Sequence, residues 1–431
     1  MGKHMLAQII IGGITMQSKS VCVIGGGFSG MTAAIESAEI GCDVYLIEKG
    51  PSLGGRVLQM YEYFPKLCPP QCGIEINYQR IRKNPKIKIF TLTEVKSISG
   101  RSGDFSVTIR INPRYVNENC TACGKCVAVC PVNKPNDYNY GLDSQKAIYL
   151  PHEMSFPMRY VIDENTCLKE QCAECVKVCP YDAISLRMQP KEFIIKADHI
   201  ILATGWTPYD ASKIEYLKYG QYKNIIRNVE MERLAAKNGP TKGKILRPSD
   251  NKEISSIAFV QCAGSRDEHH LSYCSSICCL ATIKQAFYVR DQYPDADIYI
   301  YYIDIRTPGR FEDLYAKAKD DKKIHFIKGK VADIAEDSSS NDLIVVAEDI
   351  LAGKKITQKV NMVVLATGMV PNGINVNIDG IAYDNFGFTY SNDNKNGFSI
   401  VGCAKKPTDV SDCIKMATGA AVECIQTIDE V

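Results

Sequence analysis

A strand, a glycine-rich turn and a helix near the N-terminus place the strongest restriction on how this chain can fold. Apolar residues 21–24 predict a strand, and Gly25, Gly27 and Gly30 follow it in G-x-G-x-x-G spacing. Glu48 ends the next apolar segment. Glycines at these positions let the backbone approach a pyrophosphate, the helix N-terminus favours its charge, and the acid can bind ribose hydroxyls. The segment therefore predicts a dinucleotide-binding α/β domain, without separating FAD from NAD.

Four further segments favour FAD. The sequence GGR at 54–56 follows the second strand, and two apolar strands, 200–206 and 363–369, contain Ala-Thr-Gly. They resemble a second phosphate contact and the two crossings between domains in flavoproteins with two dinucleotide-binding domains. Residues 397–425 resemble the closing strand and helix that meet the flavin, with Cys403 where an acidic residue is usual. The candidate FAD-binding residues are Gly25, Gly27, Gly30, Glu48, Lys49, Gly54, Gly55, Arg56, Ala203, Thr204, Gly205, Gly402 and Val410.

A second strand–helix–strand unit is predicted between the two Ala-Thr-Gly strands. It runs from a strand at 255–266 to a strand at 296–306, which is the position of the NAD(P) domain in disulfide reductases. The first of these strands leads into Gln-Cys-Ala-Gly-Ser-Arg and not into G-x-G-x-x-G. We therefore do not expect nicotinamide binding in this unit.

Eight of the 19 cysteines form two runs that are typical of bacterial ferredoxins. The first run, CTACGKCVAVCP, has C-x2-C-x2-C-x3-C-P spacing, and the second, CLKEQCAECVKVCP, has two extra residues in its first gap. Zinc sites usually have two separated C-x2-C pairs without the final Cys-Pro, so iron–sulfur clusters are favoured. In two-cluster ferredoxins the fourth cysteine of each run ligates the other cluster. The predicted [4Fe-4S] ligand sets are Cys120, Cys123, Cys126 and Cys179 for the first cluster, and Cys167, Cys172, Cys175 and Cys130 for the second.

Strand-like segments on both sides of these runs predict that a ferredoxin domain interrupts the FAD-binding domain. The expected fold class is α/β, a thioredoxin reductase-like flavoprotein with two dinucleotide-binding domains and an inserted α+β ferredoxin domain with two [4Fe-4S] clusters. A flavin and clusters in one chain predict electron transfer. The expected divisions are an N-terminal extension at 1–16, FAD-binding segments at 17–112, 190–250 and 369–431, the ferredoxin domain at 113–189, and a degenerate second Rossmann-like domain at 251–368.

Charge and hydropathy argue against two other classes of protein. With 51 basic and 49 acidic side chains, the net charge of +2 gives no electrostatic footprint for nucleic acid. No segment approaches the roughly 18 uninterrupted apolar residues that predict a membrane span. The short apolar run before residue 16 is followed by no small-residue cleavage site, so we expect an extension there and not a secretory signal.

The order of these motifs resembles the heterodisulfide reductase A subunit family. The resemblance rests on the FAD fingerprint, FPKLCPPQCG, the inserted ferredoxin, VQCAGSRDEHHLSYCSSICCLATIKQA and DIRTPGRFEDLY, and it spans residues 17–431. Two segments, GGRVLQMYEYFPKLCPPQCGIEINYQRI and YLPHEMSFPMRYVIDE, are similar to one branch of the family. That branch is the A subunit of the quinone-interacting membrane-bound oxidoreductase of sulfate-reducing and some sulfur-oxidising prokaryotes.

The resemblance implies a cytoplasmic subunit that its partners hold at the inner face of the cytoplasmic membrane. One implied partner is a second subunit with flavin and iron–sulfur clusters, and the other is a haem-containing membrane subunit. Electrons would pass between menaquinone and adenylylsulfate reductase. Two alternatives stay open. One is a heterodisulfide reductase A-type flavoprotein that bifurcates electrons, and the other is an NAD(P)H-dependent disulfide oxidoreductase.

A third group of cysteines, Cys262, Cys274, Cys278 and Cys279, has C-x11-C-x3-C-C spacing. Adjacent Cα atoms lie about 3.8 Å apart, below the usual disulfide range that begins at roughly 4.4 Å, so a vicinal disulfide would be strained. Cys274 and Cys278 are expected on one helical face, and Cys262 can supply a fourth thiolate from the preceding strand. Related A subunits carry a cluster at a near-identical motif, which implies a third [4Fe-4S] cluster. Buried, unreactive cysteines are the alternative.

Three residues near these motifs have open roles. The resemblance puts Lys284 near the flavin ring, where a cation could stabilise reduced anionic flavin, and a solvated helix lysine is the alternative. Cys68 and Cys72, in CPPQC, fit a redox dithiol facing the flavin, a cluster-related role or a structural role. The cysteines on apolar faces, which we expect in the core, are Cys22, Cys42, Cys413 and Cys424.

Overall fold

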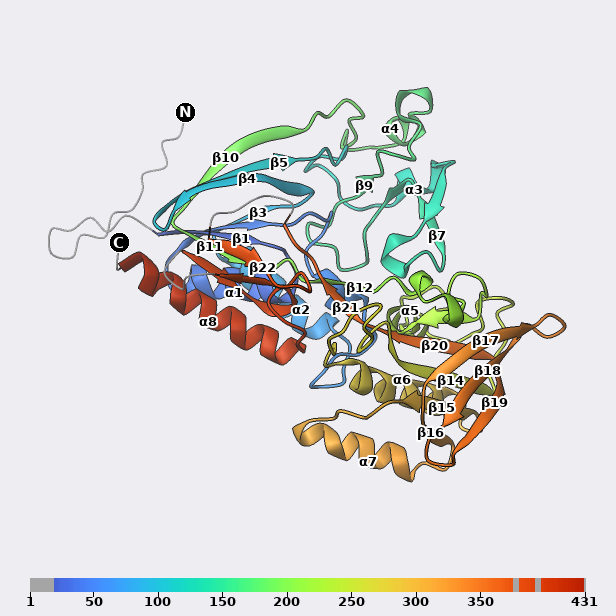
Figure 1. Ribbon diagram of the computed structural model, residues 1–431. Coiled ribbons are helices and arrows are strands. Elements are labelled where there is room, and N and C mark those ends of the chain that lie inside the picture. Colours follow the sequence, from blue (N-terminus) through green and yellow to red (C-terminus); the bar gives the residue numbers. More distant parts are fainter. Residues whose placement is uncertain (1–18, 375–379, 392–396, 430–431) are drawn as a thin grey trace, which may run out of the picture.

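The structure, a computed structural model, describes residues 19–374, 380–391 and 397–429, so the expected extension at 1–16 lies outside the described residues. The glycine-rich turn belongs to a five-stranded parallel sheet at the N-terminal end of the molecule (Figure 1). In spatial order its strands are β24 (Phe398–Ile400), β11 (His199–Leu202), β1 (Ser20–Ile24), β2 (Asp43–Ile47) and β3 (Ile87–Phe90).

Helices cover one face of this sheet, and a three-stranded antiparallel sheet covers the other. On the helical side, apolar residues of α1 such as Met31 and Ile35 pack with Val21 and Leu46 of the sheet. On the other side, every second residue of β5, including Val107 and Ile109, is buried against the sheet, as a strand covered on one face requires. The helices are α1 (Phe28–Glu39), α2 (Gln71–Lys83) and α8 (Val410–Asp429), and the antiparallel strands are β10 (Lys191–Ala197), β5 (Asp104–Ile111) and β4 (Thr93–Arg101).

The same three layers are repeated in the second unit. A five-stranded parallel sheet carries helices on one face and a three-stranded antiparallel sheet on the other, and each interface has its own apolar core. The central sheet has the order β13 (Ile225–Arg227), β20 (Met362–Thr367), β14 (Ser256–Ala263), β15 (Asp297–Tyr302) and β16 (Ile324–Lys328). The helices are α5 (Asn228–Ala235), α6 (Cys278–Gln292) and α7 (Glu312–Asp320), and the outer strands are β17 (Val331–Asp337), β18 (Asp342–Asp349) and β19 (Lys354–Val360).

Two short antiparallel strands join the units. Strand β12 (Trp206–Pro208) leaves the first Ala-Thr-Gly and pairs with β21 (Met369–Pro371), which follows the second. The chain therefore crosses between the units at the two Ala-Thr-Gly sequences. The α/β fold with two dinucleotide-binding units, predicted from the sequence, is confirmed.

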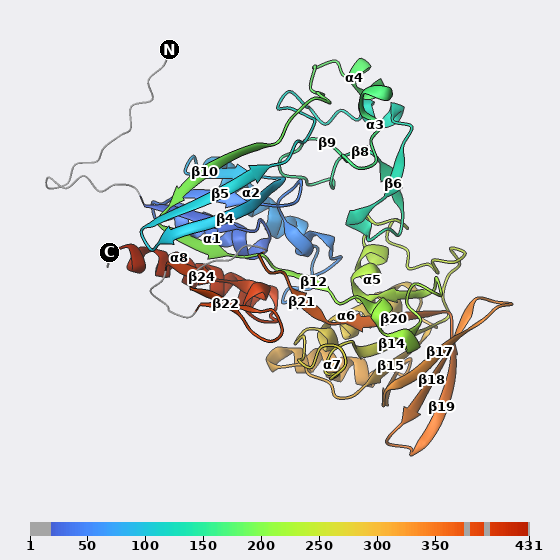
Figure 2. The ribbon, with the colours of Figure 1, turned by 45° about the horizontal axis from the view of Figure 1, so that its top comes forward.

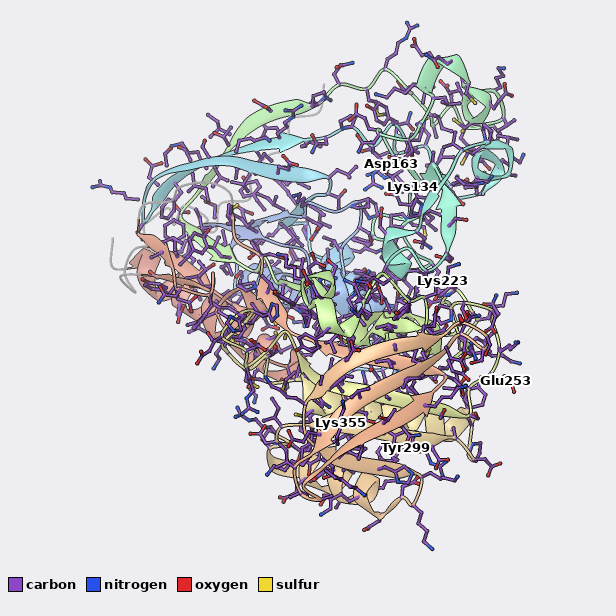
Figure 3. All side chains as sticks on the ribbon, turned by 45° about the vertical axis from the view of Figure 1, so that its right-hand side comes forward. Lys134, Asp163, Lys223, Glu253, Tyr299 and Lys355 are labelled. Atoms are coloured by element: carbon purple, nitrogen blue, oxygen red, sulfur yellow. The ribbon has the colours of Figure 1, made fainter. Side chains whose placement is uncertain are left out.

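The cysteine-rich insert lies between β5 and β10 and stands beside both units, above α5 (Figure 2). Its own small core includes Tyr115, Ile148 and Ile162 together with cysteines of both runs. A buried Lys134 ammonium pairs with Asp163 at 2.6 Å and ties the two halves of the insert together (Figure 3). The elements of the insert are α3 (Lys125–Val129), β6 (Asn133–Pro135), β7 (Ser144–Lys146), β8 (Ile148–Tyr149), β9 (Val161–Ile162) and α4 (Glu174–Lys177).

One strand-like segment of the sequence, 192–205, contributes to two sheets. Its first part is β10 of the outer antiparallel sheet, and its second part is β11 of the central parallel sheet, with Asp198 between them. A short hairpin, β22 (Ile381–Tyr383) and β23 (Thr389–Ser391), precedes β24. Within the described part of the chain, no helix combines the length and the apolar character needed to cross a membrane.

Candidate cofactor site

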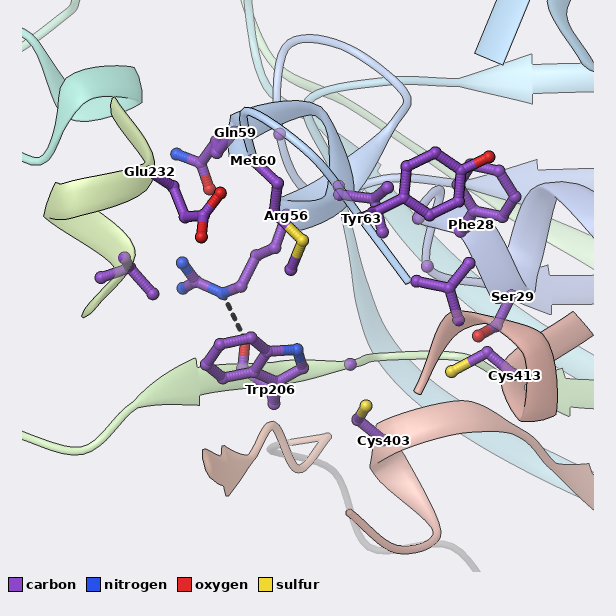
Figure 4. Close-up of a pocket in the computed structure, with 18 of the residues that line it drawn as sticks. Phe28, Ser29, Arg56, Gln59, Met60, Tyr63, Trp206, Glu232, Cys403 and Cys413 are labelled. Carbon is purple, nitrogen blue, oxygen red and sulfur yellow. Dashed lines mark hydrogen bonds between the residues drawn. The ribbon is translucent and has the colours of Figure 1, made fainter. Parts of the chain in front are cut away.

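A cavity of about 670 Å³ runs between the two units and the insert. That volume is typical of a site for a cofactor-sized ligand. Figure 4 shows part of its wall, with side chains from the first unit, the connecting strand β12, helix α5 and the C-terminal segment. The predicted FAD-binding residues that line it are Gly25, Gly27, Glu48, Gly55, Arg56, Ala203, Thr204, Gly205 and Val410.

Four predicted FAD-binding residues do not line the cavity. A Cβ atom at Gly30 would lie 1.8 Å from the Gly25 carbonyl oxygen, so Gly30 lets α1 pack closely against the turn. Gly54 and Gly402 have φ of +117° and +65°, which favours glycine, and a Cβ atom at Gly402 would lie 2.4 Å from Oγ of Ser29, which lines the cavity. Lys49 is exposed, because side chains alternate along an extended chain and its neighbour Glu48 faces inward.

Glu48 is positioned as the acid at the end of β2. Its carboxylate accepts hydrogen bonds from the backbone N–H of Gly26 at 2.7 Å and of Gly50 at 2.6 Å. Burial raises the pKa of Glu48, and the two backbone hydrogen bonds partly oppose that rise. The carboxylate is thereby fixed between the glycine turn and the following loop, where a ribose would lie.

Arg56 joins three parts of the chain at the cavity. Its Nε donates to the Trp206 carbonyl oxygen at 2.5 Å, shown as the dashed line in Figure 4, and its Nη1 donates to the Tyr140 hydroxyl at 3.2 Å. Tyr140 and Tyr138 belong to the insert and line the cavity. The sequence gives no signal for either tyrosine, because their positions depend on how the insert packs.

His152, also from the insert, lines the cavity on the side of Ser52. The His152 Nε2 and Ser52 Oγ atoms are 3.1 Å apart. Burial lowers the pKa of His152 to about 4, so this imidazole is neutral near pH 7. The insert therefore closes one side of the cavity with neutral aromatic side chains.

Lys284 lines the same cavity from α6 and is only 5% exposed. Its Nζ lies 2.9 Å from Glu232 Oε1, and it also donates to the Glu62 carbonyl oxygen. Glu232 in turn accepts hydrogen bonds from Gln285 at 2.7 Å and from the Tyr61 N–H at 3.1 Å. The alternative of a solvated helix lysine is wrong, since the side chain is buried in an ion pair.

The structure gathers the ferredoxin-type cysteines into the two crossed sets. One small cavity is lined by Cys120, Cys123, Cys126 and Cys179, and another by Cys130, Cys167, Cys172 and Cys175. Across the described residues, no three His, Cys, Asp or Glu side chains are arranged to hold a single metal ion. A cubane is several ångströms wide, so its thiolates stand farther apart than the ligands of one ion. The donor set of four thiols around each cavity fits an iron–sulfur cluster.

The third group of cysteines gathers at the start of α6. The thiols of Cys262, Cys274, Cys278 and Cys279 lie close enough to influence one another electrostatically. Burial raises the pKa of the Cys262 thiol to about 11. Cys274 lies in the loop before α6, so the expectation that Cys274 and Cys278 share one helical face is wrong. Cys262 lies at a bulge of β14, where its φ is +56°.

Cys68 and Cys72 do not line the cavity. Cys72 is exposed near the start of α2, and Cys68 pairs by a backbone bridge with Tyr63. Both thiols act electrostatically on the Tyr63 hydroxyl, and Tyr63 does line the cavity. The pair is therefore one residue removed from the cofactor site.

Cys403 and Cys413 line the cavity, which the sequence did not reveal. Cys413 was expected in the core. It is buried, with 8% of its surface exposed, and it also lines the cavity. The one signal in the sequence was that Cys403 stands where flavoproteins of this type usually have an acidic residue.

Comparison with known proteins agrees with this geometry. Residues 20–62 match the FAD dependent oxidoreductase family, and residues 113–133 match the 4Fe-4S binding domain. The fold is similar to thioredoxin reductase from Lactococcus lactis, with a TM-score of 0.53 and 15% identity over 96% of this chain and 100% of that one. Thioredoxin reductase from T. acidophilum gives a TM-score of 0.51 and 13% identity over 95% of this chain and 99% of that one. The chain is thus a flavoprotein of the thioredoxin reductase-like fold that combines an FAD-binding domain with iron–sulfur cluster binding.

The names of its curated relatives indicate a more specific class of protein than the fold does. It is 38% identical to the iron–sulfur A subunit of the CoB--CoM heterodisulfide reductase of Methanocaldococcus jannaschii, over 94% of this chain and 63% of the relative. It is 37% identical to the A subunit of the H(2):CoB-CoM heterodisulfide,ferredoxin reductase of Methanothermobacter marburgensis, over 93% of this chain and 62% of the relative. The chain spans less than two thirds of the length of these relatives. Over the part that it covers, the chain is similar to the A subunits of heterodisulfide reductases.

Proposed function

We propose that this chain is the FAD and iron–sulfur electron-transfer subunit of a heterodisulfide reductase-type complex. The relatives are named as A subunits of heterodisulfide reductases, and one name also includes ferredoxin. Those names favour the heterodisulfide reductase alternative over the expected quinone-linked one. Partnership with adenylylsulfate reductase and with a haem-containing membrane subunit rests on sequence resemblance alone.

One observation carries the proposal: a single cavity is bordered by groups from all three parts of the chain. The FAD fingerprint contributes Gly25 and Glu48, the insert contributes Tyr138 and Tyr140, and α6 contributes Lys284. Helix α6 begins with Cys278 and Cys279 of the third cysteine group. A flavin in this cavity would therefore lie between the ferredoxin-type clusters and a cluster at the start of α6, which suits a relay that splits electron pairs into single electrons.

In this proposal residues 113–189 act as a two-cluster ferredoxin domain, and the third group of cysteines binds a third [4Fe-4S] cluster. Cys274 also lines an open surface cavity of about 460 Å³ with Arg266 and Arg306, so this cluster would be within reach of a partner protein. Lys284 would provide a positive charge beside reduced flavin. Cys68 and Cys72 would lie outside the direct path of electrons.

Anaerobic measurement of iron and flavin per chain tests the proposal. Three cubane clusters predict about twelve iron atoms and one flavin. About eight iron atoms with one flavin would remove the third cluster from the proposal, and a chain that retains no flavin would refute the relay as a whole.

The composition of the native complex distinguishes the heterodisulfide reductase function from the quinone-linked function. Purification of the chain with its partners from its source cells, followed by haem staining and peptide identification, gives the composition of that complex. A heterodisulfide reductase-type subunit without haem supports the proposal. A stoichiometric haem-bearing membrane protein would favour the quinone-linked function instead.

A further inference from the structure

Two cysteines meet in the wall of the cavity. Cys403 belongs to the short 3-10 helix η7 (Gly402–Ala404), and Cys413 belongs to the first turn of α8. Their exposed fractions are 7% and 8%, they line the cavity, and their thiols contact each other. Figure 4 shows the two sulfur atoms turned toward one another beside Ser29. Neither thiol belongs to the three cysteine groups described above.

The two thiols have unequal surroundings. Cys403 donates a hydrogen bond to the Thr408 carbonyl oxygen at 3.5 Å, and the interaction with the Cys413 side chain, together with burial, raises the pKa of Cys403. The side-chain interaction with Cys403 lowers the pKa of Cys413 although burial opposes it, and a hydrogen bond from Ser29 adds to the lowering. The N-terminal turn of α8 also favours a thiolate at Cys413, against the opposing charge of Asp409. One thiol is thus suited to attack, and the other keeps its proton.

A second thiol pair provides a contrast within the same helix. Cys424, in the later part of α8, contacts Cys42, and both are buried in the apolar core between α8 and α1. Neither of them lines the cavity. The Cys42–Cys424 pair has contact between thiols but no access to a ligand, whereas the Cys403–Cys413 pair has both.

We propose that Cys403 and Cys413 are a redox-active dithiol that exchanges two electrons with the flavin in the same cavity. In the oxidising direction the two S–H bonds break and one S–S bond forms. The dithiol then transfers two electrons and two protons to FAD, which becomes fully reduced, and the reverse step restores both thiols. FAD is the only oxidant that this step requires. This inference rests on the proposed binding of FAD.

Reductive titration of the purified holoprotein under anaerobic conditions tests the inference. Oxidised wild-type protein should take up two more electron equivalents per chain than Cys413→Ser, because a disulfide is a two-electron couple. Cys424→Ser, which breaks the pair remote from the cavity, should match the wild type. Equal uptake by all three proteins at full flavin content overturns the dithiol alone. Absence of flavin from the wild type overturns the proposed function and with it this inference.

A measurement on the unaltered chain avoids any effect of substitution on folding. Trypsin separates the two cysteines, which fall in the peptides 396–405 and 406–415. After thiol alkylation, protein held with oxidised flavin should yield these peptides joined by a disulfide. Protein held with reduced flavin should yield them separately alkylated. Complete alkylation of both cysteines in both flavin states refutes the dithiol.

Discussion

Replacement of Lys284 by methionine should destabilise the cavity region strongly. Lys284 and Glu232 form a buried ion pair at 2.9 Å, with side-chain exposures of 5% and 7%. Methionine removes the cation and leaves the Glu232 carboxylate buried without its charged partner. Loss of one member of a buried pair costs about 3–5 kcal/mol, because the remaining charge has no compensation. Gln285 and Tyr61 still donate to the carboxylate, which argues for the lower end of that range.

Urea unfolding followed by tryptophan fluorescence gives a local measure of this loss. Trp206 is the only tryptophan of the chain, it lies in β12 between the two units, and it lines the same cavity as Lys284. The transition midpoint of Lys284→Met should move to lower urea concentration. The double variant Lys284→Met/Glu232→Gln should recover most of the loss, because neutralising the second partner removes the uncompensated charge.

An exposed ion pair provides the matched control. Lys177 and Glu174 lie 2.7 Å apart in α4, with side-chain exposures of 65% and 47%. Lys177→Met should leave the transition unchanged within error, since exposed pairs contribute little. If Lys284→Met unfolds at the same urea concentration as Lys177→Met, the buried ion pair does not stabilise the cavity region and the reasoning fails.

Three further sets of substitutions test the cluster ligands, the glycine turn and a buried histidine. Cys120→Ala and Cys179→Ala should each lose about four iron atoms per chain, and the double variant should lose no more, because both cysteines would serve one cluster; a loss of about eight would contradict the crossed sets. Gly30→Ala should lower the free energy of unfolding by about 1–3 kcal/mol through overpacking and release FAD, since its Cβ would lie 1.8 Å from a backbone atom. Gly419→Ala, whose Cβ would have nothing within 4 Å, should bind flavin normally. Burial lowers the pKa of His199 from 6.5 to about 4, so only the unfolded chain gains a proton there in this range and stability falls as pH decreases from 6.5 toward 4. His199→Gln should therefore flatten the pH dependence of the urea midpoint by one proton, and an unchanged slope would contradict the shift.

The glycine turn and the ferredoxin-type runs could be predicted because their chemistry depends on covalent spacing. The turn needs Gly25 and Gly27 directly after β1, and one corner of a cubane needs cysteines with two residues between them. Both patterns can therefore be recognised within a few residues of sequence. The crossed position of Cys179 beside the first run follows from the pseudo-symmetry of two-cluster ferredoxins. The same local logic failed at Lys49, because adjacency to Glu48 does not determine which side chain faces the cavity.

The residues that the sequence missed depend on contacts between distant segments. Tyr138 and Tyr140 reach the cavity because the insert is held against α5, where the fully buried Arg233 donates to Asn139 at 2.8 Å. Cys413 lies on an apolar helix face, and that pattern predicts burial without indicating what the buried face contacts. Periodicity thus gave the correct burial of Cys413, but its position opposite Cys403 requires the path of the chain from β24 into α8.

The second unit retains the layers of a dinucleotide-binding domain but lacks the glycine turn that binds the phosphates. Pyrophosphate binding needs a tight glycine turn from the end of a parallel strand directly into a helix. Here β14 ends at Ala263 and α6 begins at Cys278, and a loop with a backbone bridge between Ser265 and Leu271 separates them. Ser265 and Ser275 are buried there with their hydroxyls 3.0 Å apart, and Ser275 also accepts a hydrogen bond from the Met369 N–H at the start of β21. A loop and the third group of cysteines therefore stand where a helix N-terminus would meet nicotinamide-dinucleotide phosphates, which supports the proposed third cluster at the start of α6.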